Sequence, residues 1–427
     1  MSPFDAILTR ISVLRQGQLV GNALALYAIQ GLNYLMPLLV LPFLLRALQP
    51  EGYGAIMFAQ SLLGYAAIVV EFGFNFTAAR AISLVRDDAH AVSRIYWTTT
   101  CAKLLLLLAA ATIVAILVVL VPVFRQDWPL YAASGLLLLG NIAFPQWYFQ
   151  GLERLRDTAL IQAVAKTVVA LAAIFLVRSS QDLLLAAVIL SSPQLVGALA
   201  GWCLRKPLMP KSFHAPAWRE IVAALQDSRH LFLANIATTL YLHTNTLVLG
   251  LLVNEAAVAM YSVASRVVST VQGLAAPFMQ AVFPRASYMF VNDRAAAWAL
   301  CRSVASLVLP VMAMACLVLF SAASWVVGLL GGDEYAGAVD VLRVMSFVPL
   351  LVATAMILSQ VIMVNMGLGA QLSRIYLTVG LMNLILLPLL TLQLGAVGAA
   401  MSLVIAELLG PIMMGVAIRN ASRATAA

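Results

Sequence analysis

The sequence has little charge. Only 10% of its 427 residues are Asp, Glu, Lys or Arg, whereas 63% are hydrophobic. An average soluble domain is about 25% charged and about 45–50% apolar, so the shortage of charge excludes a soluble globular protein of this length. It also excludes intrinsic disorder, which requires low hydrophobicity and high net charge. The composition is that of a polytopic membrane protein, although its formal net charge is +8.

Cysteines and the familiar site motifs are also scarce. Cys101, Cys203, Cys301 and Cys316 lie in or beside apolar runs, without the CxxC spacing of zinc or redox sites. The chain has no P-loop, GxGxxG, HExxH or GxSxG motif. Its basic residues are scattered in short loops, which argues against nucleic-acid binding. The sequence therefore predicts no metal site, no cofactor and no catalytic residues.

What is present is a series of long apolar runs. About 20 apolar residues cross a bilayer as a helix, and runs bounded by charge, Gly or Pro predict twelve such helices. The ranges are 20–45, 53–79, 92–121, 129–150, 157–177, 182–204, 230–253, 256–283, 298–330, 338–366, 370–392 and 395–418. The run 298–330 is long enough to bend near Ser321. The N-terminus is polar for too long to begin a cleaved signal, so we expect the first run to be retained.

The distribution of basic residues predicts the orientation. With the N-terminus in the cytoplasm, the outer loops are 46–52, 122–128, 178–181, 254–255, 331–337 and 393–394, and they hold only Arg46, Arg125 and Arg178. Four more basic residues lie inside or at the edges of the runs, and the remaining 18 of 25 lie on the inner side. By the positive-inside rule, both termini are cytoplasmic. The outer loops are too short to form an extracytoplasmic domain.

The longest polar stretch, 205–229, falls between the sixth and seventh runs. It predicts an N-terminal lobe at 1–204, a cytoplasmic linker at 205–229 and a C-terminal lobe at 230–427, with six helices in each lobe. Within the linker, 218–225 predicts a short amphipathic helix on the inner surface. The halves are weakly similar, since Glu51 and Glu255 begin corresponding runs, and Arg80 and Arg285 end them. Parallel repeats of this kind are typical of transporters that rock around a central site.

Several predicted helices carry polar residues at helical spacing. A polar group at membrane depth must face protein or a water-filled cavity. The candidates for a hydrated cavity are Gln30, Asn33, Glu71, Asn75, Asn235, His243, Ser262, Ser269 and Gln280. The alternative for the small residues is close helix packing, and His243 alone is also typical of a packed, hydrogen-bonded histidine. Pro37 and Pro42 predict kinks in the first helix.

The charges at depth are mainly positive. They are Lys103, Lys166, Arg266 and Arg343, against Glu71 and Glu407. Lys166 and Arg266 lie too deep to reach the surface easily, so the cavity should suit an anion such as phosphate or pyrophosphate. Lys103 and Arg343 lie at the edges of their runs, where we expect them to snorkel. Glu71 either pairs with Arg80 or, like Glu407, couples transport to an ion.

The run from Asn22 to Ser83 resembles the N-terminus of Wzx-type O-antigen flippases. These belong to the polysaccharide transporter family of the multidrug/oligosaccharidyl-lipid/polysaccharide (MOP) superfamily. The matching features are Asn33, Pro37, Pro42, Arg46, Gly52-Tyr53-Gly54, Phe72-Gly73-Phe74 and Arg80. The segment from Val253 to Ala264 is also similar. The layout matches over most of the chain, and the likeness is most specific over 20–90 and 230–290.

This resemblance implies a V-shaped pair of six-helix lobes in the bacterial inner membrane. It implies that undecaprenyl-pyrophosphate-linked oligosaccharide moves from the cytoplasmic to the periplasmic leaflet by alternating access, while the lipid tail stays in the bilayer between the lobes. Arg266 and Lys166 would meet the pyrophosphate. Arg46, Arg80, Arg285 and Arg374 are weaker candidates at the access and exit points. The implied partners are the lipid bilayer, an O-antigen polymerase and a chain-length regulator.

Three alternatives remain at this stage. An ion-coupled multidrug exporter commonly needs a deep acid in the first lobe, and only Glu71 is placed for that. A lipid II flippase usually has more than twelve spans. A membrane polysaccharide polymerase or glycosyltransferase usually carries a large extramembrane loop, which this sequence lacks.

Overall fold

Every regular element that the structure describes is helical. The computed structural model describes residues 17–204, 208–210 and 212–424, apart from the side chains of 17–30, 32–34, 155, 234–242, 276–277, 280–281 and 424. The first half contains α2 (Gly17–Glu71), α3 (Phe74–Leu84), α4 (Ala89–Leu120), α5 (Pro122–Gln126), α6 (Trp128–Ser134), α7 (Leu136–Ala143), α8 (Gln146–Gly151), α9 (Leu155–Leu176), η1 (Ser180–Asp182), α10 (Leu183–Ser191) and α11 (Pro193–Cys203).

The second half is built in the same way. It contains α12 (Trp218–Leu252), α13 (Glu255–Gln272), α14 (Ala276–Asn292), α15 (Arg294–Ser321), α16 (Ala323–Gly331), η2 (Asp333–Tyr335), α17 (Ala338–Met345), α18 (Val348–Met356), η3 (Ile357–Met363) and α19 (Gly369–Ala424). The bend expected near Ser321 is confirmed, because α15 ends there and α16 begins two residues later. The eighth predicted run, by contrast, is divided between α13 and α14.

The two longest helices each contain a sharp break. In α2 it lies at Gln49, whose φ is 58°, directly before Pro50, and a proline disfavours helical geometry in the residue before it. In α19 it lies at Gly395, whose φ of 56° suits a residue without a Cβ. The break in α2 therefore comes after the two prolines, Pro37 and Pro42, at which we expected kinks.

The apolar helices are long enough to cross a membrane repeatedly. By length and composition, six helices qualify among the residues described, or seven if the bent pair Ser180–Ser191 and Pro193–Cys203 is one span. Two of the six, Leu35–Leu84 and Gly369–Arg423, are 50 and 55 residues long. Since about 20 residues suffice for one crossing, each has room for two. The chain is a multi-pass membrane protein, and the count of twelve crossings stays a prediction.

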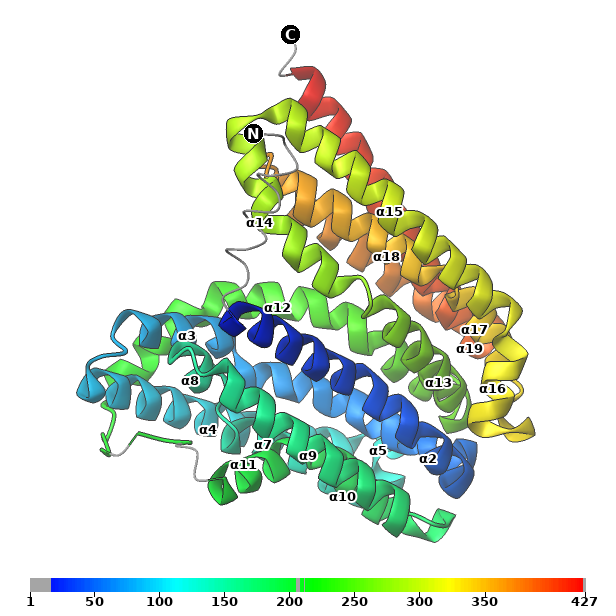
Figure 1. The fold of residues 1–427 in the computed structure, drawn as a ribbon. Coiled ribbons are helices and arrows are strands. Elements are labelled where there is room, and N and C mark those ends of the chain that lie inside the picture. Colours follow the sequence, from blue (N-terminus) through cyan, green and yellow to red (C-terminus); the bar gives the residue numbers. More distant parts are fainter. Residues whose placement is uncertain (1–16, 205–207, 211, 425–427) are drawn as a thin grey trace.

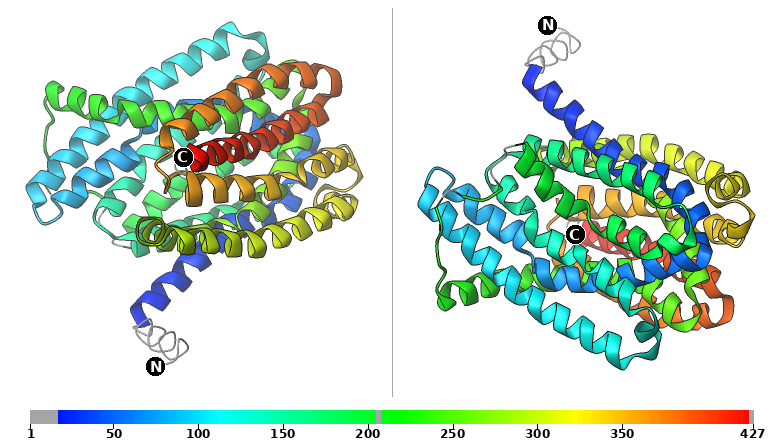
Figure 2. Two further views of the ribbon diagram at one scale, coloured as in Figure 1. Left: turned by 90° about the horizontal axis from the view of Figure 1, so that it is seen from above. Right: turned by 90° about the horizontal axis from the view of Figure 1, so that it is seen from below.

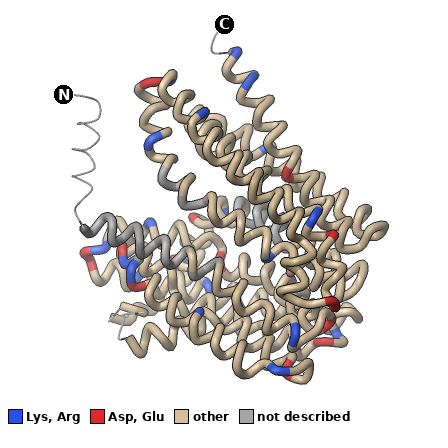
Figure 3. The backbone as a smooth tube through the Cα atoms, turned by 45° about the vertical axis from the view of Figure 1, so that its right-hand side comes forward, with Lys and Arg blue, Asp and Glu red and all other residues tan. Residues whose placement is uncertain are grey.

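The helices form two groups that touch at one end (Figure 1). Around α13, α16 and α17 the second group lies against the break of α2, whereas α14, α15 and the C-terminal end of α19 diverge from α3, α4 and α8. Figure 2 shows the same groups from above and below. In Figure 3 most lysines and arginines lie near helix ends, and the stretches between them carry few charges. Large apolar side chains such as Leu108 and Val119 are 65% and 63% exposed, as expected where a helix faces lipid.

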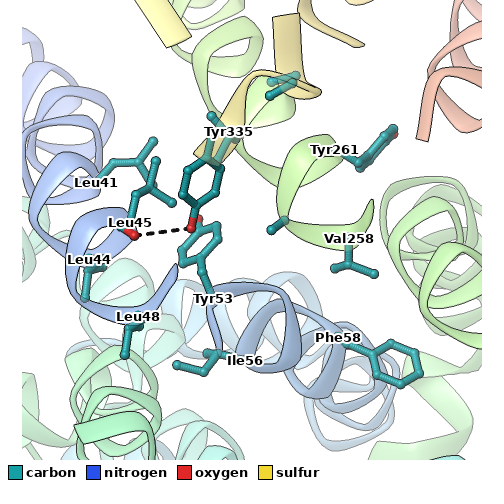
Figure 4. Packing of buried hydrophobic residues seen from close by; sticks show 14 of the residues in the cluster. Leu41, Leu44, Leu45, Leu48, Tyr53, Ile56, Phe58, Val258, Tyr261 and Tyr335 are labelled. Carbon is teal, nitrogen blue, oxygen red and sulfur yellow. Dashed lines mark hydrogen bonds between the residues drawn. The ribbon is translucent and has the colours of Figure 1, made fainter. Parts of the chain in front are cut away.

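We call the region where the two groups touch the closed end (Figure 4). Leu45, Ile56 and Tyr335 are fully buried there. The Tyr335 hydroxyl donates to the Leu45 carbonyl oxygen at 3.4 Å, and Arg46 Nη2 donates to the Leu329 carbonyl oxygen at 3.2 Å. Both bonds join the first half of the chain to the second.

Glycine permits the tightest contact at the closed end. A Cβ built on Gly54 would collide with the backbone carbonyl of Glu255 at the start of α13. Nearby, a Cβ on Gly250 of α12 would strike the ring of Phe58. Gly54 and Glu255 belong to the corresponding sequence segments of the two halves, so the halves meet at equivalent positions.

The linker between the halves is bound to the first half. Ser93 Oγ and Trp97 Nε1 both donate to the Ser212 carbonyl oxygen, at 2.6 and 3.1 Å. Glu220 accepts from His214 Nε2 at 3.0 Å and from the Ala217 backbone N–H at 2.9 Å, and these two bonds hold the pKa of its carboxyl below the usual range.

The amphipathic segment at 218–225 is not the short separate helix that we expected. It forms the first turns of the 35-residue α12 and is continuous with the following apolar part. Because α12 passes without interruption from the polar linker into its apolar part, the linker is continuous with a helix that lines the interior.

Candidate functional site

A central cavity of about 510 Å³ lies where α2, α7, α11, α12 and α13 meet. All the residues that α11, α12 and α13 contribute to its wall are polar. The polar lining consists of Tyr53, Gln60, Ser61, Glu71, Asn141, Gln194, His243, Thr246, Ser262, Ser265, Arg266 and Ser269. Five predicted residues are thereby brought together, namely Glu71, His243, Ser262, Ser269 and Arg266. The cavity is formed by both halves of the chain.

Arg266 is the basic side chain of this cavity. It is exposed although it lies in the middle of α13, whose neighbouring Val263, Ala264 and Val267 are buried. Ser262 and Ser269 lie four and three residues from it and therefore on the same helix face, and the adjacent Ser265 also lines the cavity. The fully buried Tyr53 interacts with its guanidinium. This contact leaves other donors of the planar group free to bind an anion in the cavity.

A second polar space, which we call the first-half pocket, adjoins the central cavity. It has a volume of about 300 Å³ and shares Glu71, Asn141 and Gln194 with the cavity wall. Lys166 of α9 lines it, and so do Asn75, Lys103, Gln146 and Gln162. Lys166 and Arg266 thus line adjoining polar spaces, and they come from different halves of the chain.

The position of Lys103 differs from the prediction. We expected it to snorkel, but it is only 2% exposed, because it lies on the inward face of α4 beside the fully buried Ala102. Its ammonium donates to both oxygens of Asn141, to the carbonyl oxygen at 2.8 Å and to Oδ1 at 2.9 Å. It also interacts electrostatically with Glu71, which accepts a hydrogen bond from Asn75. Glu71 therefore has a resident cation close by and does not pair with the exposed Arg80, which lies on α3.

The Lys103–Asn141 contact should stabilise the first half. We expect Asn141→Leu to lower its stability by about 1–3 kcal/mol, because the buried ammonium loses an acceptor. Removing both polar partners costs less than stranding one of them, so Lys103→Met/Asn141→Leu should be more stable than the sum of the two single changes implies. The stabilities of the wild type, the two single variants and the double variant can be compared by thermal melting in detergent. Additive losses would show that the two side chains are not coupled.

The remaining predicted basic residues lie outside these cavities. Arg46 is at the closed end, while Arg80 of α3, Arg285 of α14 and Arg374 of α19 are exposed and line neither space. Arg343 is also exposed, as expected at the edge of a run, and contacts Asp340 at 3.4 Å and Ser324 at 3.3 Å.

Glu407, the second acid proposed for ion coupling, is half-buried on α19. It interacts electrostatically with the buried Tyr261 rather than lining the described cavities. Four predicted polar residues lie outside the side chains that the structure describes: Gln30, Asn33, Asn235 and Gln280.

Some important polar residues were not singled out from the sequence. Gln60, Asn141 and Gln194 line the central cavity. Each is an amide inside a predicted apolar run, and this was the sequence feature that could have identified them. A separate buried chain of hydrogen bonds joins α12, α13 and α19: Asn245 donates to Tyr261 at 2.8 Å, Asn383 to Asn245 at 3.3 Å and Ser402 to Asn383 at 2.6 Å. Because it is closed off from the cavity, we interpret it as polar packing between helices.

Known proteins resemble the chain over nearly its whole length. A protein named "Putative O-antigen transporter" from Escherichia coli (strain K12) is 29% identical over 93% of this chain and 96% of its own length. A multidrug resistance MATE family transporter of the MOP superfamily, solved in an inward-facing conformation, has a TM-score of 0.66 at 15% identity and covers 94% of this chain and 99% of its own. The lipid II flippase MurJ, in an inward closed conformation, has a TM-score of 0.63 at 12% identity, covering 93% and 87%.

These structural neighbours show that the chain has the MOP superfamily fold. The family model described as "Polysaccharide biosynthesis protein" matches residues 19–290. The named relatives are transporters and flippases, not catalysts. Since the matched residues make up well over half of its length, the chain belongs to this polysaccharide biosynthesis protein family.

Proposed function

We propose that this protein flips an undecaprenyl-pyrophosphate-linked oligosaccharide from the cytoplasmic to the periplasmic leaflet of the bacterial inner membrane. The observation that carries the proposal is the placement of Arg266 and Lys166 in the walls of connected polar spaces at membrane depth. Ionisable side chains at that depth commonly mark substrate pathways, and pyrophosphate is well suited to the planar fork of arginine. The family and the O-antigen transporter relative support this substrate class.

The wall residues suggest how the substrate is divided among them. The pyrophosphate is held between Arg266 and Lys166. The sugars lie among the hydroxyl and amide groups of the central cavity, where Gln60, Gln194 and Ser262 can replace the hydrogen bonds lost from water. Arg80, Arg285 and Arg374 are the candidates for the first encounter with the anion, since they are exposed outside the cavity. Arg46 lies at the closed end, where the substrate would leave.

The proposed cycle is alternating access between two six-helix lobes, 1–204 and 230–427, joined by the linker 205–229. The closed end is built from residues of the predicted outer loops 46–52, 254–255 and 331–337. With both termini in the cytoplasm, this arrangement opens the cavity to the cytoplasm, where the lipid-linked sugar is assembled. Release requires the closed end to separate. An O-antigen polymerase and a chain-length regulator would then act on the delivered product.

Two features favour this function over ion-coupled multidrug export. The cavity carries the guanidinium of Arg266, whose positive charge repels cationic drugs. Glu71, the acid best placed for cation exchange, lies beside the ammonium of Lys103. A resident positive charge reduces the affinity of the carboxylate for an external cation.

The direct test is complementation. We expect the chain to restore surface polysaccharide in a bacterium that lacks its own O-antigen flippase and is supplied with defined repeat units. Purified protein in liposomes should also make the sugar of an undecaprenyl-pyrophosphate-linked oligosaccharide in the inner leaflet accessible to an impermeant reagent outside. Protein that inserts at normal levels yet moves none of a panel of repeat units, while it exports cationic dyes, would contradict the proposal.

A further inference from the structure

A third space, the apolar side pocket, lies beside the two polar ones. It has a volume of about 190 Å³ and is enclosed by both parts of α2, by α9 and by the junction of α10 with α11. Except for Tyr53, Gln60, Lys166 and Arg266, every residue that lines it is apolar. Its walls include Pro37 and Leu41 of α2 on one side and Val169, Ala170 and Ala173 of α9 on the other.

The two cations stand where the apolar and polar spaces meet. Lys166 lines both the side pocket and the first-half pocket, and Arg266 lines both the side pocket and the central cavity. A path through the interior therefore passes from apolar walls, between two positive charges, to a polar wall of amides and hydroxyls. This order matches a ligand in which an apolar chain, an anion and a polar glycan follow one another.

We propose that the apolar side pocket binds the first isoprene units of the carrier lipid, next to its pyrophosphate. This inference rests on the proposed function and assigns a position to a part of the substrate that was expected to stay wholly in the bilayer between the lobes. The pocket has less than half the volume of the central cavity, so it holds only the beginning of the chain, and the remainder lies in the membrane.

The pocket also supplies a reason for selecting this lipid. Burial of the proximal units adds a favourable hydrophobic contribution at a fixed distance from the charges that bind the pyrophosphate. A branched, unsaturated chain next to the anion fits this arrangement directly. In a glycerophospholipid the glycerol ester groups lie between the phosphate and the acyl chains, so polar atoms would enter the apolar pocket, where they find few partners.

The test uses the full-length protein in liposomes and undecaprenyl pyrophosphate that carries a diazirine either on its first isoprene unit or at its far end. We expect the first probe to label peptides 36–44 and 166–173, and the second to label lipid-facing surfaces. A phosphatidylglycerol with a diazirine on its acyl chain tests whether an ordinary membrane phospholipid occupies the pocket instead. Equal labelling of the two peptides by this phospholipid, or labelling of other segments by the first probe, would overturn the inference.

Two variants of α9 give a second measurement. Ala170→Phe fills the pocket, whereas Val168→Phe enlarges a side chain that is 47% exposed on the lipid-facing side of the same helix. We expect Ala170→Phe to reduce proximal labelling at least tenfold and Val168→Phe to leave it unchanged. If Ala170→Phe does not fold, the labelled positions in the wild-type protein still decide. If the wild type transports substrate but the proximal probe labels other segments, only the pocket inference is rejected. If the wild type shows neither transport nor labelling, the proposed function is rejected.

Discussion

Replacing Gly54 with valine should abolish transport while the protein still inserts into the membrane. The new side chain would meet the backbone carbonyl of Glu255, and neither helix backbone can move without separating the two halves. Overpacking of this kind costs about 1–3 kcal/mol, which shifts a two-state equilibrium by about 5–150-fold. We therefore expect the closed end to open in most molecules.

Distances across the closed end measure this shift. Spin labels at Arg125→Cys in α5 and Asp333→Cys in η2, both exposed and in opposite halves, should move apart in Gly54→Val when the native cysteines are replaced by serine. Gly328→Val is the matched control, because Gly328 lies in α16 at the same end and a Cβ there has no neighbour within 4 Å. An unchanged distance distribution in Gly54→Val would show that the glycine contact does not hold the end closed.

Arg266→Ala should also abolish delivery of polysaccharide to the cell surface, with the protein level maintained. Removing one charge from a desolvated, hydrogen-bonded pair costs about 2–5 kcal/mol. Transport should therefore fall by at least about 30-fold, because about 1.4 kcal/mol corresponds to a factor of ten. Arg266→Lys keeps the charge but not the planar fork, so we expect intermediate transport.

The control for Arg266 is Arg302→Ala, which removes an exposed arginine of the same half, on α15, that does not line the cavity. Surface polysaccharide can be quantified on gels, and binding of undecaprenyl pyrophosphate can be measured with purified protein. Normal polysaccharide in Arg266→Ala would remove this residue from the proposed anion site. A loss of equal size in both variants would indicate a general dependence on surface charge rather than a cavity contact.

The composition and the apolar runs were sufficient to predict much of the architecture. The low charge and the run lengths indicated a helical multi-pass protein, and the unusual length of 298–330 indicated the bend at Ser321. The breaks were harder to predict. Gln49 has a positive φ because of the proline that follows and the packing of the closed end, and the division between α13 and α14 follows from tertiary contacts that no local pattern records.

The site was predictable in part, and most readily at its charged residues. Arg266 and Glu71 stood out because charge is rare inside apolar runs, and both line the central cavity. Lys103 was misjudged because depth along a helix does not reveal which face is buried, and its acceptor Asn141 lies 38 residues away in the sequence. Amides such as Gln60 and Gln194 acquire their roles only when α2, α11 and α13 are brought together.

The buried contact between Lys103 and Asn141 has an evolutionary consequence. A descendant that loses the asparagine strands an ammonium inside the protein, and one that loses the lysine leaves an amide and Glu71 without their cation. Each change is therefore most readily tolerated after a compensating change at the other position, so the two positions should covary among homologues. We expect relatives with lysine at the first position to keep a side-chain acceptor at the second, and relatives with an apolar residue at the first to have lost it.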